Sequence, residues 1–181
     1  MTDMRTFLLV LWSVFAFALA AVAEKSPISI SVAIPTSRDG ERAVTDYGHD
    51  AHFHVVIANV SNKPQRIWQE WCSWGYFGLR FEFTDEKGKK WFAEKKPRDW
   101  IKNYPDWWTL APYESLVLNV YFGDSEIWQG FPFPERMSQI VTMRAILEFK
   151  ADDDSRKLNI WTGRVASKEE KFTFYRRTAS K

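Results

Sequence analysis

The stretch that decides the fold runs from Ile28 to Ile34 and has the sequence Ile-Ser-Ile-Ser-Val-Ala-Ile. Apolar residues at every second position are typical of a strand that buries one face, because successive side chains of a strand point to opposite sides of the sheet. Pro35 and the polar run 37–40 end this pattern. The same alternation returns along the chain, so the sequence predicts a fold built from short strands.

Further strands are predicted wherever apolar, alternating segments are separated by turn-forming residues. These segments are 52–59, 65–72, 79–83, 90–94, 115–122, 139–149, 158–161 and 171–176. Residues 95–114 are rich in proline and aromatic residues and are predicted to form a long loop, and the acidic run 152–154 a solvated turn. The expected fold is all-β, an immunoglobulin-like antiparallel β-sandwich of about seven to nine strands without a disulfide.

The first 23 residues have the order of a secretory signal peptide. Arg5 precedes an apolar run from Phe7 to Ala20, and Ala21-Val22-Ala23 supplies the small residues that precede a cleavage site. The apolar run is too short for a comfortable membrane span. We therefore expect a leader at 1–23 and one domain at 24–181, exported to the periplasm or the cell exterior and soluble there, with no transmembrane segment after cleavage.

Cysteine content and charge restrict the function further. Cys72 is the single cysteine, so an intrachain disulfide is impossible and packing must hold the fold. Its place between Trp71 and Trp74 favours a small buried group, and pairing with a second chain is the alternative. The net charge of +2, with acidic and basic residues interspersed, gives no indication of a nucleic-acid partner.

The chain contains 10 tryptophans, and aromatic residues are concentrated in two segments, 68–76 and 100–108. Exposed aromatic rings stack on sugars and form hot spots of protein interfaces. The alternative is that these rings fold over the sheet and seal its core. Trp107 and Trp108 are expected to be the more exposed pair, since neighbouring residues of an extended loop rarely both point inward. The candidate ligand-binding residues are Trp68, Trp71, Trp100, Tyr104, Trp107 and Trp108.

The three histidines lie close together, as His49, His52 and His54. Two of them are two residues apart on a predicted strand and would share a face, so the three imidazoles are suited to zinc or copper. Alternatively, the strand imidazoles face solvent while the apolar residues between them face the core. A metal-binding protein or metalloenzyme is therefore an alternative function.

No catalytic motif stands out, and Ser73 is not set in a nucleophile elbow, since Trp71 occupies the position of the first glycine of G-x-S-x-G. A basic run surrounds Trp91 and Trp100, and it either grips an acidic polysaccharide or forms a solvated edge that discourages sheet pairing. Its members are Lys87, Lys89, Lys90, Lys95, Lys96 and Arg98. We expect a non-enzymatic protein without a cofactor, which binds a protein or a cell-envelope glycan through its aromatic loop.

The segment Trp68-Gln69-Glu70-Trp71-Cys72-Ser73-Trp74-Gly75-Tyr76, after the turn Asn59-Val60-Ser61, resembles a segment of small exported bacterial proteins of unassigned function. Those proteins carry Trp-x-x-Trp-Asn-Ser-Trp-Gly-Tyr after an Asn-x-Ser turn, so Cys72 stands in place of their asparagine. Residues 161–165 resemble their penultimate strand. The resemblance implies export from a bacterial cytoplasm.

The wider layout is similar to the intracellular proteinase inhibitor (BsuPI-like) immunoglobulin-type domain. The shared features are a strand ending in Asn59, a hairpin at Gly88, the turn 111–115 and Trp128 after the next strand. This similarity implies a β-sandwich and protein binding, with proteinase inhibition as a further alternative function. It identifies no inhibitory loop residue.

Overall fold

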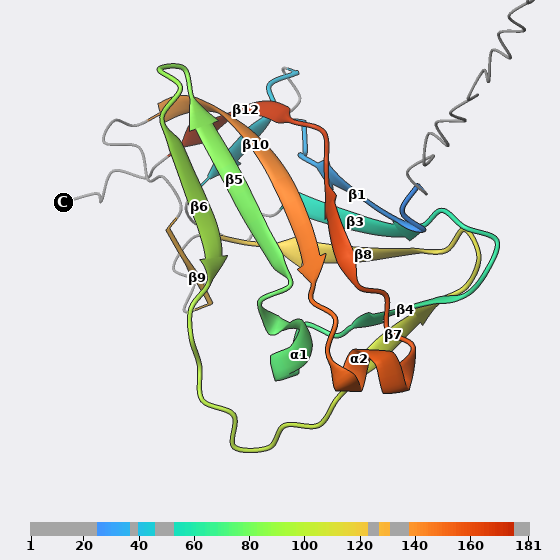
Figure 1. Cartoon of the computed structure of the whole chain (residues 1–181). Coiled ribbons are helices and arrows are strands. Elements are labelled where there is room, and N and C mark those ends of the chain that lie inside the picture. The colour runs from blue at the N-terminus through green and yellow to red at the C-terminus, as the bar shows by residue number, and fades with distance from the viewer. Residues whose placement is uncertain (1–24, 37–39, 46–52, 123–126, 131–137, 176–181) are drawn as a thin grey trace, which may run out of the picture.

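The computed structural model describes residues 25–36, 40–45, 53–122, 127–130 and 138–175 (Figure 1). The expected leader lies outside these residues, as do His49 and His52. Twelve strands and two short helices occupy most of the described chain, so the all-β prediction is confirmed. In this part of the chain, no helix is long and apolar enough to cross a membrane.

The elements follow one another in a simple order, with both helices at connections between strands. The strands are β1 (Ile28–Ala33), β2 (Ala43–Thr45), β3 (Phe53–Asn59), β4 (Gln65–Trp68), β5 (Leu79–Asp85), β6 (Lys90–Lys95), β7 (Trp107–Leu110), β8 (Ser115–Val120), β9 (Trp128–Gln129), β10 (Ser138–Phe149), β11 (Gly163–Ala166) and β12 (Glu170–Tyr175). The helices are α1 (Ser73–Tyr76) and α2 (Asp153–Leu158).

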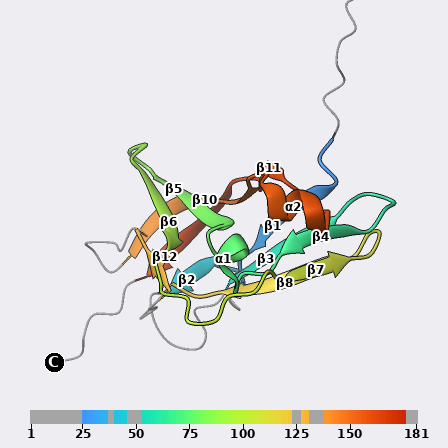
Figure 2. The ribbon, with the colours of Figure 1, turned by 60° about the horizontal axis from the view of Figure 1, so that its bottom comes forward.

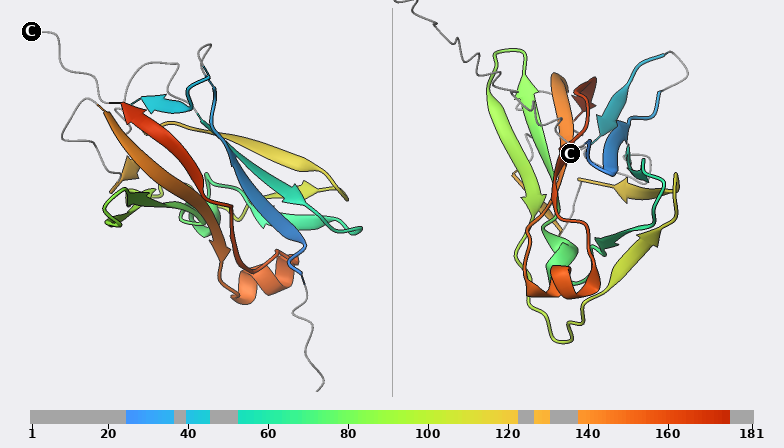
Figure 3. Two further views of the ribbon diagram at one scale, coloured as in Figure 1. Left: turned by 90° about the horizontal axis from the view of Figure 1, so that it is seen from above. Right: turned by 45° about the vertical axis from the view of Figure 1, so that its right-hand side comes forward.

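The strands form two main sheets. The larger has the order β2-β12-β10-β5-β6-β9, and β11 pairs with β10 beyond the end of β12. The smaller has the order β1-β3-β8. Every strand pair is antiparallel except β2 with β12. The two sheets lie as two layers, which are best seen in Figure 3.

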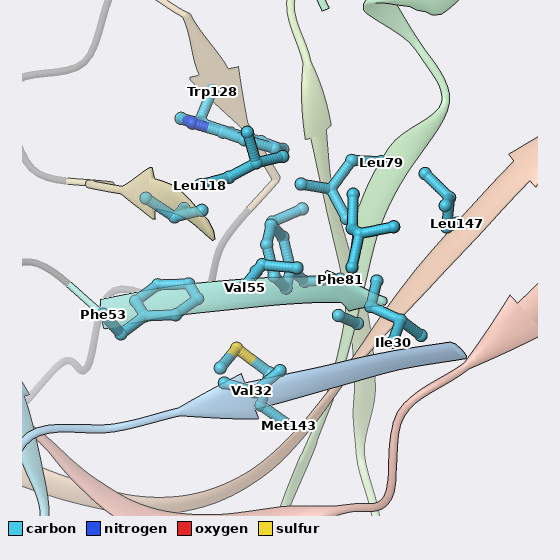
Figure 4. Packing of buried hydrophobic residues seen from close by; sticks show 14 of the residues in the cluster. Ile30, Val32, Phe53, Val55, Leu79, Phe81, Leu118, Trp128, Met143 and Leu147 are labelled. Atoms are coloured by element: carbon cyan, nitrogen blue, oxygen red, sulfur yellow. The ribbon is translucent and has the colours of Figure 1, made fainter. Parts of the chain in front are cut away.

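The core fills the space between the layers, because strand alternation turns one apolar face of each sheet inward. Phe53 of the smaller sheet meets Phe81 of the larger sheet with ring centroids 5.3 Å apart. Phe122 packs against both rings, and Figure 4 shows Val55 and Met143 in the same space. Each buried aromatic side chain removes roughly 150–250 Å² from water, which gives a disulfide-free fold much of its stability.

One antiparallel ribbon links this core to an end of the molecule. β3 pairs with β8, and β4, the next strand along the chain, pairs with β7, which precedes β8. The ribbon is interrupted once, at residues 60–64 and 111–114, which do not pair as strands with each other. Its first half crosses the middle of the core, and its second half extends the core towards one end through Ile67, Trp68 and Leu110.

Asn59 joins the two halves of this ribbon. Its side chain is buried, and its amide nitrogen donates to the backbone carbonyls of Lys63, Leu110 and Ala111. Its amide oxygen accepts from the backbone N–H and the hydroxyl of Ser61. The side chain thus replaces the ladder hydrogen bonds that the interruption removes.

Most predicted strands are confirmed with small shifts at their ends, but two predicted strands and the predicted long loop differ from the structure. The strand expected at 65–72 ends at Trp68, and the chain then turns into α1. The long loop expected at 95–114 contains β7, which finds a partner in β4. No strand forms at 158–161. Leu158 is the last residue of α2, and the connection that follows has one isolated bridge, between Ile160 and Arg66.

The acidic turn 152–154 begins α2 instead of forming a solvated loop. Asp152 accepts a hydrogen bond from the backbone N–H of Ser155, and the Ser155 hydroxyl accepts one from the backbone N–H of Asp152. This reciprocal pair is a capping box, which stabilises the first turn of a helix. Asn159 ends the helix with a φ of 54°, the left-handed conformation common at this position.

Candidate binding surface

The two helices lie at the same end of the molecule as the connection between β6 and β7, residues 96–106 (Figures 1 and 2). Aromatic and apolar side chains come to this end from β7, α1, the residues on either side of α1, and the connection. We call it the aromatic end, defined by Trp71, Trp74, Tyr76, Phe77, Trp100, Ile101, Tyr104, Trp107 and Trp108.

Close backbone packing fixes α1 in this position. A Cβ atom on Gly75 would overlap the backbone carbonyl of Gln69, so only glycine lets the helix approach the turn before it. Asn103 ties the connection to the helix, because its side chain accepts from the Ser73 backbone N–H at 3.0 Å and donates to the Ser73 hydroxyl at 2.6 Å. The connection is irregular in backbone but held in place.

The tryptophans divide between burial and exposure. Trp68 is buried against Trp74, whose indole N–H donates to the Asp154 carboxylate of α2 at 2.8 Å. Trp71 is 58% exposed and packs edge-on against Trp108, with ring centroids 5.2 Å apart. Trp68 lies in a strand and Trp71 in the following turn, which explains why residues so close in sequence differ so much in exposure.

The candidates from the second segment also divide. Tyr104 is 76% exposed, and Trp100 is half-buried. Trp107 and Trp108 are both half-buried, because they belong to β7 and pair with Trp68 and Ile67 across the ribbon. The expectation that they are the more exposed pair is therefore wrong. Phe77 and Ile101 are exposed at the same end, and they are not among the candidates predicted from the sequence.

Lys95 differs most from what its sequence context predicts, which is a place in an exposed basic run. It is only 4% exposed and forms an ion pair with Glu70 at 2.9 Å. Its ammonium group also lies 4.8 Å from the ring centroid of Tyr76. Burial lowers the pKa of Lys95, and Glu70 acts in the opposite direction. Lys95 lies on the same face of β6 as Trp91 and Ala93, which point inward. This two-residue spacing can be seen in the sequence.

Arg98 lies on the surface near this ion pair. Its guanidinium carbon is 4.5 Å from the ring centroid of Trp100 and 5.5 Å from that of Tyr76. The two rings are almost perpendicular, with an interplanar angle of 86°, so the guanidinium lies in the corner between them. Within the described part of the chain, no carboxylate lies at ion-pair distance from Arg98.

The predicted histidine site lies largely outside the described residues, which include only His54. This side chain is on the outer face of the smaller sheet, where its Nδ1 is 2.8 Å from the Asn119 side-chain oxygen. Its neighbours Phe53 and Val55 face the core, as expected. The described residues alone contain no group of three metal-ligating side chains. A site that includes His49 and His52 stays a prediction.

Cys72 is buried at the start of α1, which confirms the expectation of a small buried group. Its thiol lies 3.2 Å from the backbone carbonyl of Gln69 and 3.5 Å from that of Asp106. The thiol therefore contacts both the turn before α1 and the connection between β6 and β7 from a buried position.

The chain matches no known protein-family model, no curated protein and no solved structure. The resemblances to small exported bacterial proteins and to the BsuPI-like domain stay hypotheses.

Proposed function

We propose that this protein is an exported, non-catalytic binding domain of immunoglobulin-like type, which recognises a protein or a cell-envelope glycan through its aromatic end. The observation that carries the proposal is the exposure of Trp71 and Tyr104 on a rigidly supported surface. The leader pattern of the first 23 residues supports export, and two facing, mainly antiparallel sheets support the immunoglobulin-like assignment.

Exposure of large apolar side chains to water is unfavourable in free energy, and several such side chains lie together at this end. Ile101 is 97% exposed, and Phe77 is more than half exposed. Exposed patches of this kind mark interaction sites in soluble proteins, and aromatic residues dominate their binding energy.

The support beneath these side chains favours binding as well. Asn103 holds the connection to α1, and the ion pair of Lys95 with Glu70 holds the end of β6 to the turn before α1. A surface that is already ordered loses little conformational entropy when a ligand binds. The aromatic end therefore combines exposed contact area with a fixed frame.

The test is a double substitution, Trp71→Ala with Tyr104→Ala, in the purified protein. Its readout is co-sedimentation with bacterial cell-envelope fragments, before and after protease digestion of the fragments. We expect the double variant to raise the apparent Kd at least tenfold, or about 1.4 kcal/mol, because the two exposed rings supply the contact. Loss of binding after protease digestion identifies a protein ligand, and retention identifies a glycan.

Tyr113→Ala is the matched control. Tyr113 is a tyrosine with nearly the same exposure as Tyr104, 73%, and also adjoins a proline, but it lies in the turn between β7 and β8. It should bind the fragments like the unchanged protein. Unchanged binding by the Trp71 and Tyr104 double variant, or an equal loss in Tyr113→Ala, overturns the proposal.

A further inference from the structure

Arg98 differs from the other arginines that the structure describes. Each of the other six has an oxygen partner, either a carboxylate or, for one of them, the backbone carbonyl of Leu158. The six are Arg42, Arg66, Arg80, Arg144, Arg156 and Arg164. Among the described residues, Arg98 has no such oxygen partner; it lies over the rings of Trp100 and Tyr76, and its side chain is exposed.

The geometry of this contact leaves the hydrogen-bond donors of Arg98 available. A guanidinium that stacks on an aromatic ring uses the face of its plane, whereas its five N–H groups point outward within that plane. Two nearly perpendicular rings restrict how the group can turn. Arg98 is thus a donor fork without an oxygen partner among the described residues, and such a fork matches the two oxygens of a carboxylate.

The surrounding charge also favours an anion at this place. Lys95 also lies over the ring of Tyr76, and beside the larger effect of burial the positive charge of Arg98 contributes to the lowered pKa of Lys95. Glu70 neutralises Lys95, but no carboxylate among the described residues does so for Arg98. A bound anion would relieve the repulsion between the two cations.

We propose that Arg98 is the anion-recognition group of the aromatic end and that its ligand is a polysaccharide whose sugar rings carry carboxylates. This inference rests on the proposed function and specifies its ligand class. Trp100 offers a partly exposed ring beside the donor fork, and Tyr104 offers another on the same connection. A sugar ring stacks its C–H face on such a ring while its carboxylate meets the fork, whereas the carboxylates of an acidic peptide lack a rigid ring to stack.

The experiment measures binding of the purified protein to polygalacturonate, alginate and hyaluronate by calorimetry. Fully methyl-esterified polygalacturonate is the neutral polymer, and poly-glutamate is the acidic peptide. We expect at least one acidic polysaccharide to bind at least tenfold more tightly than the neutral ester and poly-glutamate. Arg98→Gln should lose about tenfold in affinity, and Arg98→Lys should lose part of it, because an ammonium group lacks the planar fork.

Lys89→Gln is the matched control, since Lys89 also lies over a tryptophan two residues later, Trp91, at 5.0 Å. This substitution also removes one positive charge, but at the hairpin between β5 and β6, and it should leave the affinity for the acidic polysaccharide unchanged. Circular dichroism of each variant verifies that folding is intact. An affinity that Arg98→Gln leaves unchanged, or a neutral ester that binds equally well, overturns the inference.

The remaining outcomes separate this inference from the proposed function. If poly-glutamate binds best and requires Arg98, the glycan assignment is wrong and the ligand is an acidic peptide. If no acidic polymer binds while the Trp71 and Tyr104 double variant still loses envelope binding, the anion inference fails and the binding proposal stands. If that double variant binds normally too, both fail.

Discussion

The molecule contains two groups of aromatic side chains that differ in their exposure to solvent. Phe53, Phe81, Phe122 and Trp128 are buried between the sheets, with ring centroids 5.2–5.3 Å apart in their closest pairs. The rings of the aromatic end come from a turn, a short helix, a connection and a short ribbon, and several stay exposed. Residue type is the same in both groups. Three of the four buried rings lie in strands, which direct alternate side chains into the core, whereas the most exposed rings of the aromatic end, Trp71, Phe77 and Tyr104, lie in irregular segments.

The largest effect should come from the buried group. Phe81→Ala removes a fully buried ring that contacts Phe53, Phe122 and Trp128, and we expect a loss of about 3–5 kcal/mol in the free energy of unfolding. Urea denaturation measures it. Phe92→Ala on the outer face of the same sheet, where the ring is 50% exposed, is the control and should cost less than about 1 kcal/mol. Equal losses would contradict the division into buried and exposed rings.

Asn59→Asp tests the joint between the two regions. The change places a carboxylate oxygen against three backbone carbonyls, which leaves a buried charge without donors there, and we expect a loss of about 3 kcal/mol at pH 7. Thermal unfolding measures the loss. Asn62→Asp, at an exposed position in the same interruption of the ribbon, should change stability by less than about 0.5 kcal/mol. A stable Asn59→Asp protein would show that the ribbon does not depend on this amide.

Glu70→Gln tests the ion pair beneath the aromatic end. It leaves the buried ammonium of Lys95 without its carboxylate, and we expect a loss of about 2 kcal/mol at pH 7, since Glu70 itself is 33% exposed. Lys95→Met with Glu70→Gln should recover most of it, because the uncompensated charge is gone. Urea denaturation of both variants measures this.

The pH dependence of Glu70→Gln has a definite sign. The pKa of Lys95 is already lowered by burial, and without Glu70 it falls further. Between the folded and unfolded pKa values the unfolded chain binds more protons, so stability rises with pH in that window. The deficit of Glu70→Gln should therefore shrink as the pH rises from 7 towards 10. A deficit independent of pH would show that Lys95 is not the group responsible.

Asp152→Ala tests α2, which covers Trp74 behind the aromatic end. The backbone N–H of Ser155 lowers the pKa of Asp152, so the stability that the carboxylate contributes is present above the unfolded pKa and lost as the pH falls through the lowered folded value. We expect a loss of about 1 kcal/mol at pH 7 that diminishes towards pH 2. Thermal melts at both pH values measure it. Asp153→Ala, on the same turn, is the control for charge alone.

The predictable part of the structure follows from periodicity. In strands such as Ile28–Ala33 and Leu79–Asp85, the alternation of apolar and polar residues shows which face is buried. These strands were predicted correctly. The aromatic end was predicted by composition, but the exposure of its residues depends on partners distant in sequence. β7 is a strand because β4 lies beside it, and this makes Trp107 and Trp108 half-buried. The alternation of β6 indicates an inward position for Lys95, but its carboxylate partner there, Glu70, comes from 25 residues earlier in the chain.

The smallest effect should come from Tyr104→Ala, which decides between the two interpretations that the sequence left open. If the ring seals the core, its removal should cost at least 1 kcal/mol in the free energy of unfolding. Because the side chain is 76% exposed, we expect a change below about 0.5 kcal/mol, together with part of the loss of envelope binding expected of the double variant. Urea denaturation and envelope co-sedimentation of the same protein sample measure both quantities. A destabilised variant that still binds normally would assign the ring to the fold and not to a ligand.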